Sequence, residues 1–198
     1  MTSASTSDIF QFKITLKGAQ PLIWRRIQIS KNATFEKFHL AVNKSMGWNE
    51  SHVHEFRLKT KTDVIGPKDR SCFIDAMCWD NVLGKRNILD ESKIKISTHF
   101  NKPKDSMVYV YDLGDRWTHS IVLEDILQSL PKKKYPVCLD GRRACPPDDC
   151  GGEPGFKDLL EILSNPRHPE FKEKKEWLCY IGKRNWKPEV FDVKSVKS

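Results

Sequence analysis

The sequence predicts a single α+β domain in which an antiparallel or mixed sheet of about five strands carries helices on one face. Three observations lead to this fold class. Segments with a two-residue apolar period and segments with a helical period follow one another along the chain. The 198 residues suffice for one domain with a substantial core. A hydrophobic fraction of 38% beside 30% charged residues is ordinary for a globular protein. We place the domain at residues 9–192 and expect residues 1–8 and 193–198 to be disordered.

The first predicted element is a β-hairpin. Apolar and polar residues alternate over residues 10–16, which is the period of a half-buried strand. Gly18 and Pro21 then indicate a turn. Residues 22–30, rich in Ile and Trp, are expected to return beside the first strand.

A helix and a third strand follow. Apolar residues recur at helical spacing over 35–46, after Thr34 as a possible N-cap and before Gly47, which ends the pattern. His39 lies on the apolar stripe of this helix, which favours a packed, hydrogen-bonded core histidine over a metal ligand. Residues 52–59 alternate again and predict a third strand.

The middle of the chain is less regular until a second hairpin begins. Residues 60–106 mix proline, glycine and charged residues, so we expect only short elements there, over 72–79 and 94–96. Strands are predicted over 107–112 and 116–124, because the residues between them supply the Gly and Asp of a tight turn.

The C-terminal third predicts two helices. Leucines recur at helical spacing after Pro154, and the pattern stops at residue 163 before an Asn-Pro pair. Pro169 is placed to open another helix that runs until Gly182. A last short strand is expected over 190–193.

Three cysteines in a short proline-braced loop indicate a zinc site. Cys138, Cys145 and Cys150 offer three thiolates for a tetrahedral ion. His119 is the best fourth ligand, because the strand alternation turns it toward the interior, and His54 is the second choice. Zinc is therefore the candidate cofactor. The alternative is that these are free cysteines that pack the loop onto the core.

A second interpretation uses carboxylates and imidazoles around a divalent ion, as in metal-assisted hydrolysis. The alternative is that the aspartates of the hairpin only stabilise the turn, because hairpin turns favour Asp and Gly for backbone reasons alone. The ion would take Asp112, Asp115, His119 and Glu124, with His52 and His54 as further ligands and Asp148 and Asp149 opposite. Candidate binding residues are accordingly Asp112, Asp115, Trp117, Asp148, Asp149 and His54.

An excess of basic residues favours contact with polyanions. The formal net charge is +8. The basic residues are densest at 132–134, 172–175 and 183–187, where Trp186 could stack on a base between cations. The competing interpretation is a solvated surface.

No membrane partner is expected. No window approaches the roughly 18 apolar residues of a membrane-spanning helix. The first ten residues lack the basic and apolar regions of a secretory signal, so we expect an intracellular protein, cytoplasmic or nuclear. In such a compartment the six cysteines are expected to be thiols or metal ligands rather than disulfides.

Several motifs together resemble one family. With them the chain resembles the plasmid pRiA-type ORF-three-like proteins, which also bear an insertion-element passenger or TnpR-like label. The resemblance covers the whole predicted domain; it implies a compact α+β fold and leaves the biochemical role undefined. The motifs are PLIWRRI at 21–27, MGW at 46–48, HVHEF at 52–56, YVYDLGDRWTH at 109–119, CLDGRRACPPDDCGG at 138–152, GFKDLLEIL at 155–163 and HPEF at 168–171.

These observations favour a binding or interaction module associated with mobile-element or nucleic-acid biology, with zinc as a stabilising ion and no catalytic residue assigned. The alternative is a small metal-dependent hydrolase that uses Asp112, Asp115 and His119.

Overall fold

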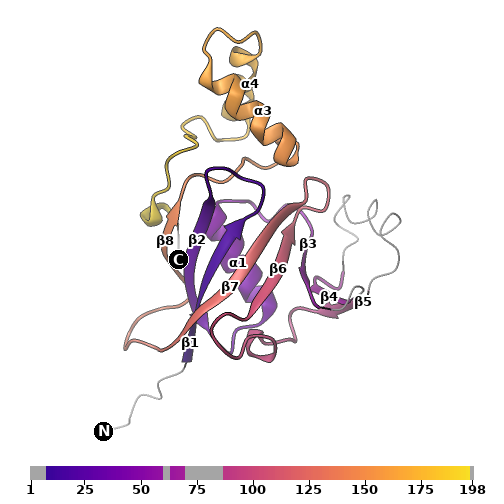
Figure 1. Cartoon of the computed structure of the whole chain (residues 1–198), viewed down its shortest axis with the longest axis vertical. Helices are drawn as coiled ribbons and strands as arrows, with labels where there is room; N and C mark the ends of the chain where they lie inside the picture. Colours follow the sequence, from indigo (N-terminus) through magenta and orange to yellow (C-terminus); the bar gives the residue numbers. More distant parts are fainter. Residues whose placement is uncertain (1–7, 60–62, 70–86, 197–198) are drawn as a thin grey trace.

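The computed structural model describes residues 8–59, 63–69 and 87–196, and its strands form one mixed sheet (Figure 1). The strand order is β5-β4-β3-β6-β7-β1-β2-β8, and β4–β5 is the parallel pair in an otherwise antiparallel sheet. The predicted α+β class is confirmed, but the sheet has eight strands where about five were expected. The strands are β1 (Asp8–Leu16), β2 (Ile23–Ser30), β3 (His54–Arg57), β4 (Asp63–Gly66), β5 (Asn87–Asp90), β6 (Ser106–Tyr111), β7 (Trp117–Gln128) and β8 (Val137–Arg142).

The predicted hairpins and the first helix are confirmed. β1 lies in the middle of the sheet between β2 and β7, and the strand alternation buries its apolar residues. α1 (Phe35–Met46) begins at Thr34, whose hydroxyl accepts a hydrogen bond from the Lys37 amide. It ends at Gly47, which adopts the left-handed conformation at φ 87° that favours glycine.

The sequence suggested that the helices cover one face of the sheet, but they do not all do so. α1 crosses one face, whereas α3 (Gly152–Ser164) and α4 (Phe171–Tyr180) form a pair beyond the end of the sheet (Figure 1). α4 buries only Leu178, so it has little apolar surface to place on a sheet. Two short 3-10 helices, η1 (Ile96–Thr98) and η2 (Val193–Ser195), complete the described elements. None of the helices described is long and apolar enough to cross a membrane.

An aromatic cluster forms the centre of the core between α1 and the sheet. Phe12 on β1 contacts Phe38 on α1 and Phe100, with ring centroids 4.6 and 4.8 Å apart. Phe35 and Phe56 join the same cluster at 4.9 Å. Each of these rings is at most 1% exposed, so the apolar stripe of α1 is covered by the sheet.

The other differences from the sequence predictions lie near the chain ends and in the middle. Residues 190–192 form no strand, and 193–195 form η2; the ring of Phe191 instead lies over the Arg25 guanidinium at 3.7 Å. Of the short elements expected in the middle, 94–96 meets η1 only at Ile96, and 72–79 lies outside the described residues. The ends predicted to be disordered also lie outside them, except for Asp8, which begins β1, and residues 193–196.

Candidate metal centre

The tight turn between β6 and β7 fixes the first residue of the site. Asp112 adopts a left-handed backbone at φ 59°, which Asp tolerates better than most residues. Its Oδ1 accepts hydrogen bonds from the amides of Gly114 at 2.8 Å and Asp115 at 3.0 Å. Turn chemistry is therefore confirmed for Asp112. The side chain is also buried, and this burial raises the pKa of its carboxyl group.

The loop after β8 is held near this turn by one close backbone approach and by hydrogen bonds to two side chains. Gly152 lies so near the turn that a Cβ there would come within 2.8 Å of the Asp115 carbonyl oxygen. The Gly151 amide donates to Asp115 Oδ2 at 3.2 Å, and the Trp48 indole donates to the Pro146 carbonyl at 2.9 Å. These contacts bring Asp149 to the side of Asp112.

His52, just before β3, lies between the two aspartates. Its Nδ1 is 3.6 Å from Asp112 Oδ2, and its Nε2 is 3.3 Å from Asp149 Oδ1. One donor atom from each of the three residues lies within 4.8 Å of the others, and within the part of the chain that the structure describes this is the one such group of three. Metal bonds of about 2.1 Å require somewhat shorter donor separations. The 72% exposed side chain of Asp149 is free to make that adjustment.

Asp148 and Tyr111 lie beside the group. Tyr111 donates its hydroxyl to Asp148 Oδ1 at 3.5 Å, and the Tyr111 ring contacts His52 edge-on with centroids 5.8 Å apart. Burial raises the pKa of the Asp148 carboxyl group. Two carboxylates that burial penalises as anions therefore adjoin one imidazole, and a bound cation would relieve that penalty.

The structure does not bring the predicted zinc ligands together. Cys138 lies on β8, with its thiol 3.6 Å from the Asp140 carbonyl oxygen. Cys150 faces α3, and burial raises the pKa of its thiol to about 12. His119 is on β7 inside the core, beside Trp48 at 5.4 Å between ring centroids. None of them belongs to the three-donor group found among the described residues.

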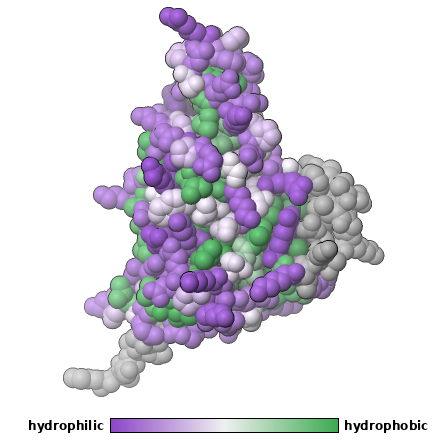
Figure 2. Space-filling view, viewed as in Figure 1, coloured by the Kyte–Doolittle hydropathy of each residue, from purple (hydrophilic) through white to green (hydrophobic). Residues whose placement is uncertain are grey.

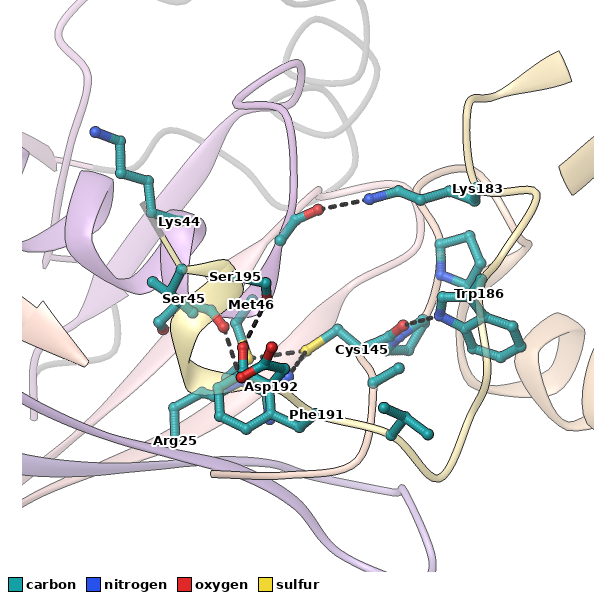
Figure 3. Close-up of a pocket in the computed structure, with 16 residues that line it drawn as sticks. Arg25, Lys44, Ser45, Met46, Cys145, Lys183, Trp186, Phe191, Asp192 and Ser195 are labelled. Atoms are coloured by element: carbon teal, nitrogen blue, oxygen red, sulfur yellow. Dashed lines mark hydrogen bonds between the residues drawn. The ribbon is translucent and has the colours of Figure 1, made fainter. Parts of the chain in front are cut away.

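The Cys145 thiol contacts Arg25 and Met46, neither of which is a predicted zinc ligand. Figure 3 shows its thiol turned toward Arg25 and Met46, in an open pocket of about 570 Å³. Its sulfur accepts a hydrogen bond from Arg25 Nη2 at 3.3 Å and lies 3.0 Å from Met46 Sδ. Burial raises the pKa of the Cys145 thiol to about 11. These contacts match the alternative that the cysteines pack the loop onto the core.

The remaining candidate residues serve the core. The rings of His54 and His39 stack with centroids 3.4 Å apart, and each ring also has a polar neighbour. His54 Nε2 is 2.6 Å from Glu91 Oε2, and His39 Nδ1 is 2.8 Å from the Tyr109 hydroxyl, as predicted for a core histidine. Trp117 is buried against Phe156 and Trp48.

The sequence analysis named all three residues of the observed group, but only among a larger set of candidates. Asp112 and Asp149 were candidate binding residues, and His52 was only a further ligand of the divalent-ion interpretation. Their shared signal is that each lies in a motif that carries the family resemblance: HVHEF, YVYDLGDRWTH and CLDGRRACPPDDCGG. The fold brings these three motifs to one place.

Comparison with known proteins agrees with that resemblance. The model of the plasmid pRiA4b ORF-3-like protein family matches residues 8–195. The chain belongs to this family. A relative, "Uncharacterized protein y4hQ" of Sinorhizobium fredii, is 29% identical over 173 residues, which cover 86% of this chain and 81% of that protein. The crystal structure of a protein of unknown function, MM3350 from Methanosarcina mazei Go1, is similar with a TM-score of 0.80 and 33% identity, over 97% of this chain and 99% of that chain.

The burial of His119 predicts a loss of stability in acid. His119 is fully buried, and this burial lowers its pKa to about 3, against about 6.5 when unfolded. Because the folded pKa lies below the unfolded one, stability is complete above pH 6.5 and falls as the pH drops below it. At pH 5 the loss from this residue is ~2 kcal/mol. The variant His119→Phe should therefore lose ~2 kcal/mol less between pH 7 and pH 5 than the wild type.

Urea unfolding with a chelator present measures this difference without any contribution from metal. His168→Phe, at a histidine between α3 and α4, is the control and should show the wild-type loss. An equal pH dependence in His119→Phe and the wild type would contradict the prediction.

Proposed function

We propose that the protein is a binding module that holds a divalent transition-metal ion, Zn²⁺ or Mn²⁺, with His52, Asp112 and Asp149. The observation that supports this most directly is the group of three donor atoms within 4.8 Å of one another. An imidazole and two carboxylates are ligands that such ions accept. The three donors come from three separate segments: the connection from α1 to β3, the turn after β6 and the loop after β8. A shared ion would therefore cross-link them.

The environment of Asp112 strengthens the proposal. Its Oδ1 is occupied by two turn amides, whereas its Oδ2 points toward His52. One oxygen thus holds the turn while the other remains directed at the proposed ion, as expected for a carboxylate ligand supported by outer hydrogen bonds. Burial disfavours the charged form of this carboxyl group, and a nearby dication favours it.

Metal binding should stabilise the fold, and Asp149→Asn should abolish that effect. A ligand at 100 times its Kd stabilises a protein by about 2.7 kcal/mol when only the folded state binds it. Asp149 is exposed, and Asn tolerates its left-handed backbone at φ 58°, so the apo variant should remain as stable as the wild type. Thermal melting with and without Zn²⁺ or Mn²⁺, and calorimetric titration with each ion, measure the effect.

Asp158→Asn, at an exposed carboxylate on α3, is the matched control and should keep the full metal response. Because Asp112→Asn preserves an oxygen for the turn amides, it offers a second variant that should lose the metal while keeping the turn. Equal metal affinity in Asp149→Asn, Asp112→Asn and the wild type would sink the proposal.

A second candidate is a metal-dependent hydrolase. Asp148, whose pKa burial raises, adjoins the proposed ion and an open pocket, which suits a proton-transfer role beside a metal-bound water. Of the three residues first expected to act, only Asp112 is in this place. Asp115 Oδ2 instead accepts from the Gly151 amide, and His119 lies in the core. The active group would accordingly be Asp112, His52, Asp149 and Asp148.

Hydrolysis should then require both the ion and Asp148. We expect Mn²⁺-dependent turnover of p-nitrophenyl acetate or bis-p-nitrophenyl phosphate, reduced by about 10²-fold or more in Asp148→Asn, in line with the loss of a general acid or base. Release of p-nitrophenol measures it, and Asp158→Asn serves as control. Turnover that persists in a chelator would exclude this mechanism.

Nucleic-acid binding is the third candidate, and the helical tip supports it. Hydrophilic residues predominate at the tip formed by α3 and α4 (Figure 2). Tyr180, the last residue of α4, has a side chain that is 90% exposed, and Arg184 four residues later is exposed as well, so an aromatic ring and a cation are available to an unpaired base. Trp186 is less suited to stacking, because its indole nitrogen donates to the Cys145 carbonyl at 2.9 Å.

Removal of the exposed ring should weaken binding to single-stranded nucleic acid. Stacking of one base contributes about 1–3 kcal/mol, so Tyr180→Ala should raise the Kd for a labelled oligonucleotide by roughly tenfold. Fluorescence anisotropy over a salt series measures it, with Leu130→Ala at another exposed apolar residue as control. No binding at low salt would rule out this candidate.

A further inference from the structure

An open pocket adjoins the proposed metal centre. Its volume is about 540 Å³, and Asp149 belongs both to its wall and to the metal-binding group. The rest of the wall is mainly polar and includes one cation. The lining residues are Asn49, Ser51, Asp148, Asp149, Ile181 and Lys183. With three protein ligands, an ion at this place would keep coordination positions for a further ligand.

Lys183 supplies the cation of this pocket from a defined position. Its backbone amide donates to the carbonyl of the buried Leu178 at 2.7 Å, and its Nζ donates to the Gly47 carbonyl at 2.9 Å. Figure 3 shows the second of these bonds. Gly47 is the only hydrogen-bond partner of the ammonium group among the described residues, so two of its three N–H groups can serve a ligand.

Because of the charges around the pocket, an anion can bind there only when the metal is bound. Asp112, Asp148 and Asp149 together outweigh the single positive charge of Lys183, so the metal-free pocket repels anions. A divalent ion cancels that excess. An anion then meets an open coordination position on one side and an ammonium group on the other.

We propose that the loaded centre binds a phosphate group, with one oxygen on the metal and another accepting a hydrogen bond from Lys183. This inference rests on the proposed metal function and names the class of its ligand. A tetrahedral oxyanion suits the pocket because its several oxygens can reach both cations at once, and Asn49 adds an amide donor at the rim. The source is either free phosphate or the phosphate group of a larger molecule.

Inorganic phosphate is the probe, and Mn²⁺ is the ion, because a bound paramagnetic ion broadens the ³¹P resonance of nearby phosphate. The full chain is first titrated with Mn²⁺ and then with phosphate. We expect phosphate binding with Mn²⁺ and none with chelator. Loss of a hydrogen bond to a charged group corresponds to roughly a tenfold to hundredfold change in affinity, so Lys183→Met should weaken phosphate binding by at least about tenfold.

The same variant should bind Mn²⁺ at least as tightly as the wild type, because Lys183 is not a metal ligand and its positive charge opposes a nearby cation. Lys183→Arg retains the positive charge and should restore most of the phosphate affinity. Lys187→Met, at an exposed lysine outside the pocket, should bind phosphate as the wild type does. Thermal melting of each variant shows whether it is folded.

The outcomes separate the two proposals. Mn²⁺ binding without phosphate binding, or equal phosphate affinity in Lys183→Met and the wild type, would overturn this inference alone. Failure to bind Mn²⁺ or Zn²⁺ would overturn the metal function and this inference together. If a nucleotide binds the loaded centre but inorganic phosphate does not, recognition depends on the rest of the molecule, and the proposal for the phosphate group itself is wrong.

Discussion

The close approach of the loop after β8 to the β6–β7 turn determines where the C-terminal part of the chain lies. At Gly152 any side chain would collide with the Asp115 carbonyl oxygen. The Trp48 and Trp186 indoles bond the carbonyls of Pro146 and Cys145, so consecutive peptide groups of the loop are held from two sides. This anchoring lets α3 begin next to the β6–β7 turn, at the end of the sheet, and places Asp149 beside Asp112. The candidate site is thus a consequence of backbone packing.

Local patterns predicted the elements whose apolar residues face a single core. β1, β7 and α1 show a clear period of two or 3.6 residues, because one side of each meets the core and the other does not. β8 has no such pattern, because it is an edge strand whose residues are mostly half-buried. Its Gly141 is required by the nearby Trp24 carbonyl and Arg25 side chain, a constraint set by tertiary contacts.

The sequence indicated which types of residue the candidate site contains, but it did not indicate which of these residues contact one another. The region that is dense in cysteines, aspartates and histidines holds two of the three proposed ligands, Asp112 and Asp149, whereas His52 lies outside it. Which of them meet depends on contacts far apart in sequence: Cys145 meets Arg25, whereas Asp149 meets His52. Strand alternation correctly turned His119 inward, where its neighbours include the aromatic rings of Trp48 and Tyr109, and among the described residues it joins no three-donor group. Residue type alone therefore does not decide which of these groups meet.

The uneven burial of the three proposed ligands bears on what the centre can do. Asp112 is 5% exposed at its side chain and is held by turn amides, so it loses little conformational entropy when an ion arrives. Asp149 is 72% exposed and must become ordered. A site with one held and one exposed carboxylate binds its ion less tightly than a fully preorganised cage, since ordering the exposed side chain reduces the net affinity. An ion in the proposed site would also be accessible from the pocket side. An ion held in this way is suited to exchange a water for an incoming oxygen ligand, which a closed structural zinc site with four protein ligands does not allow.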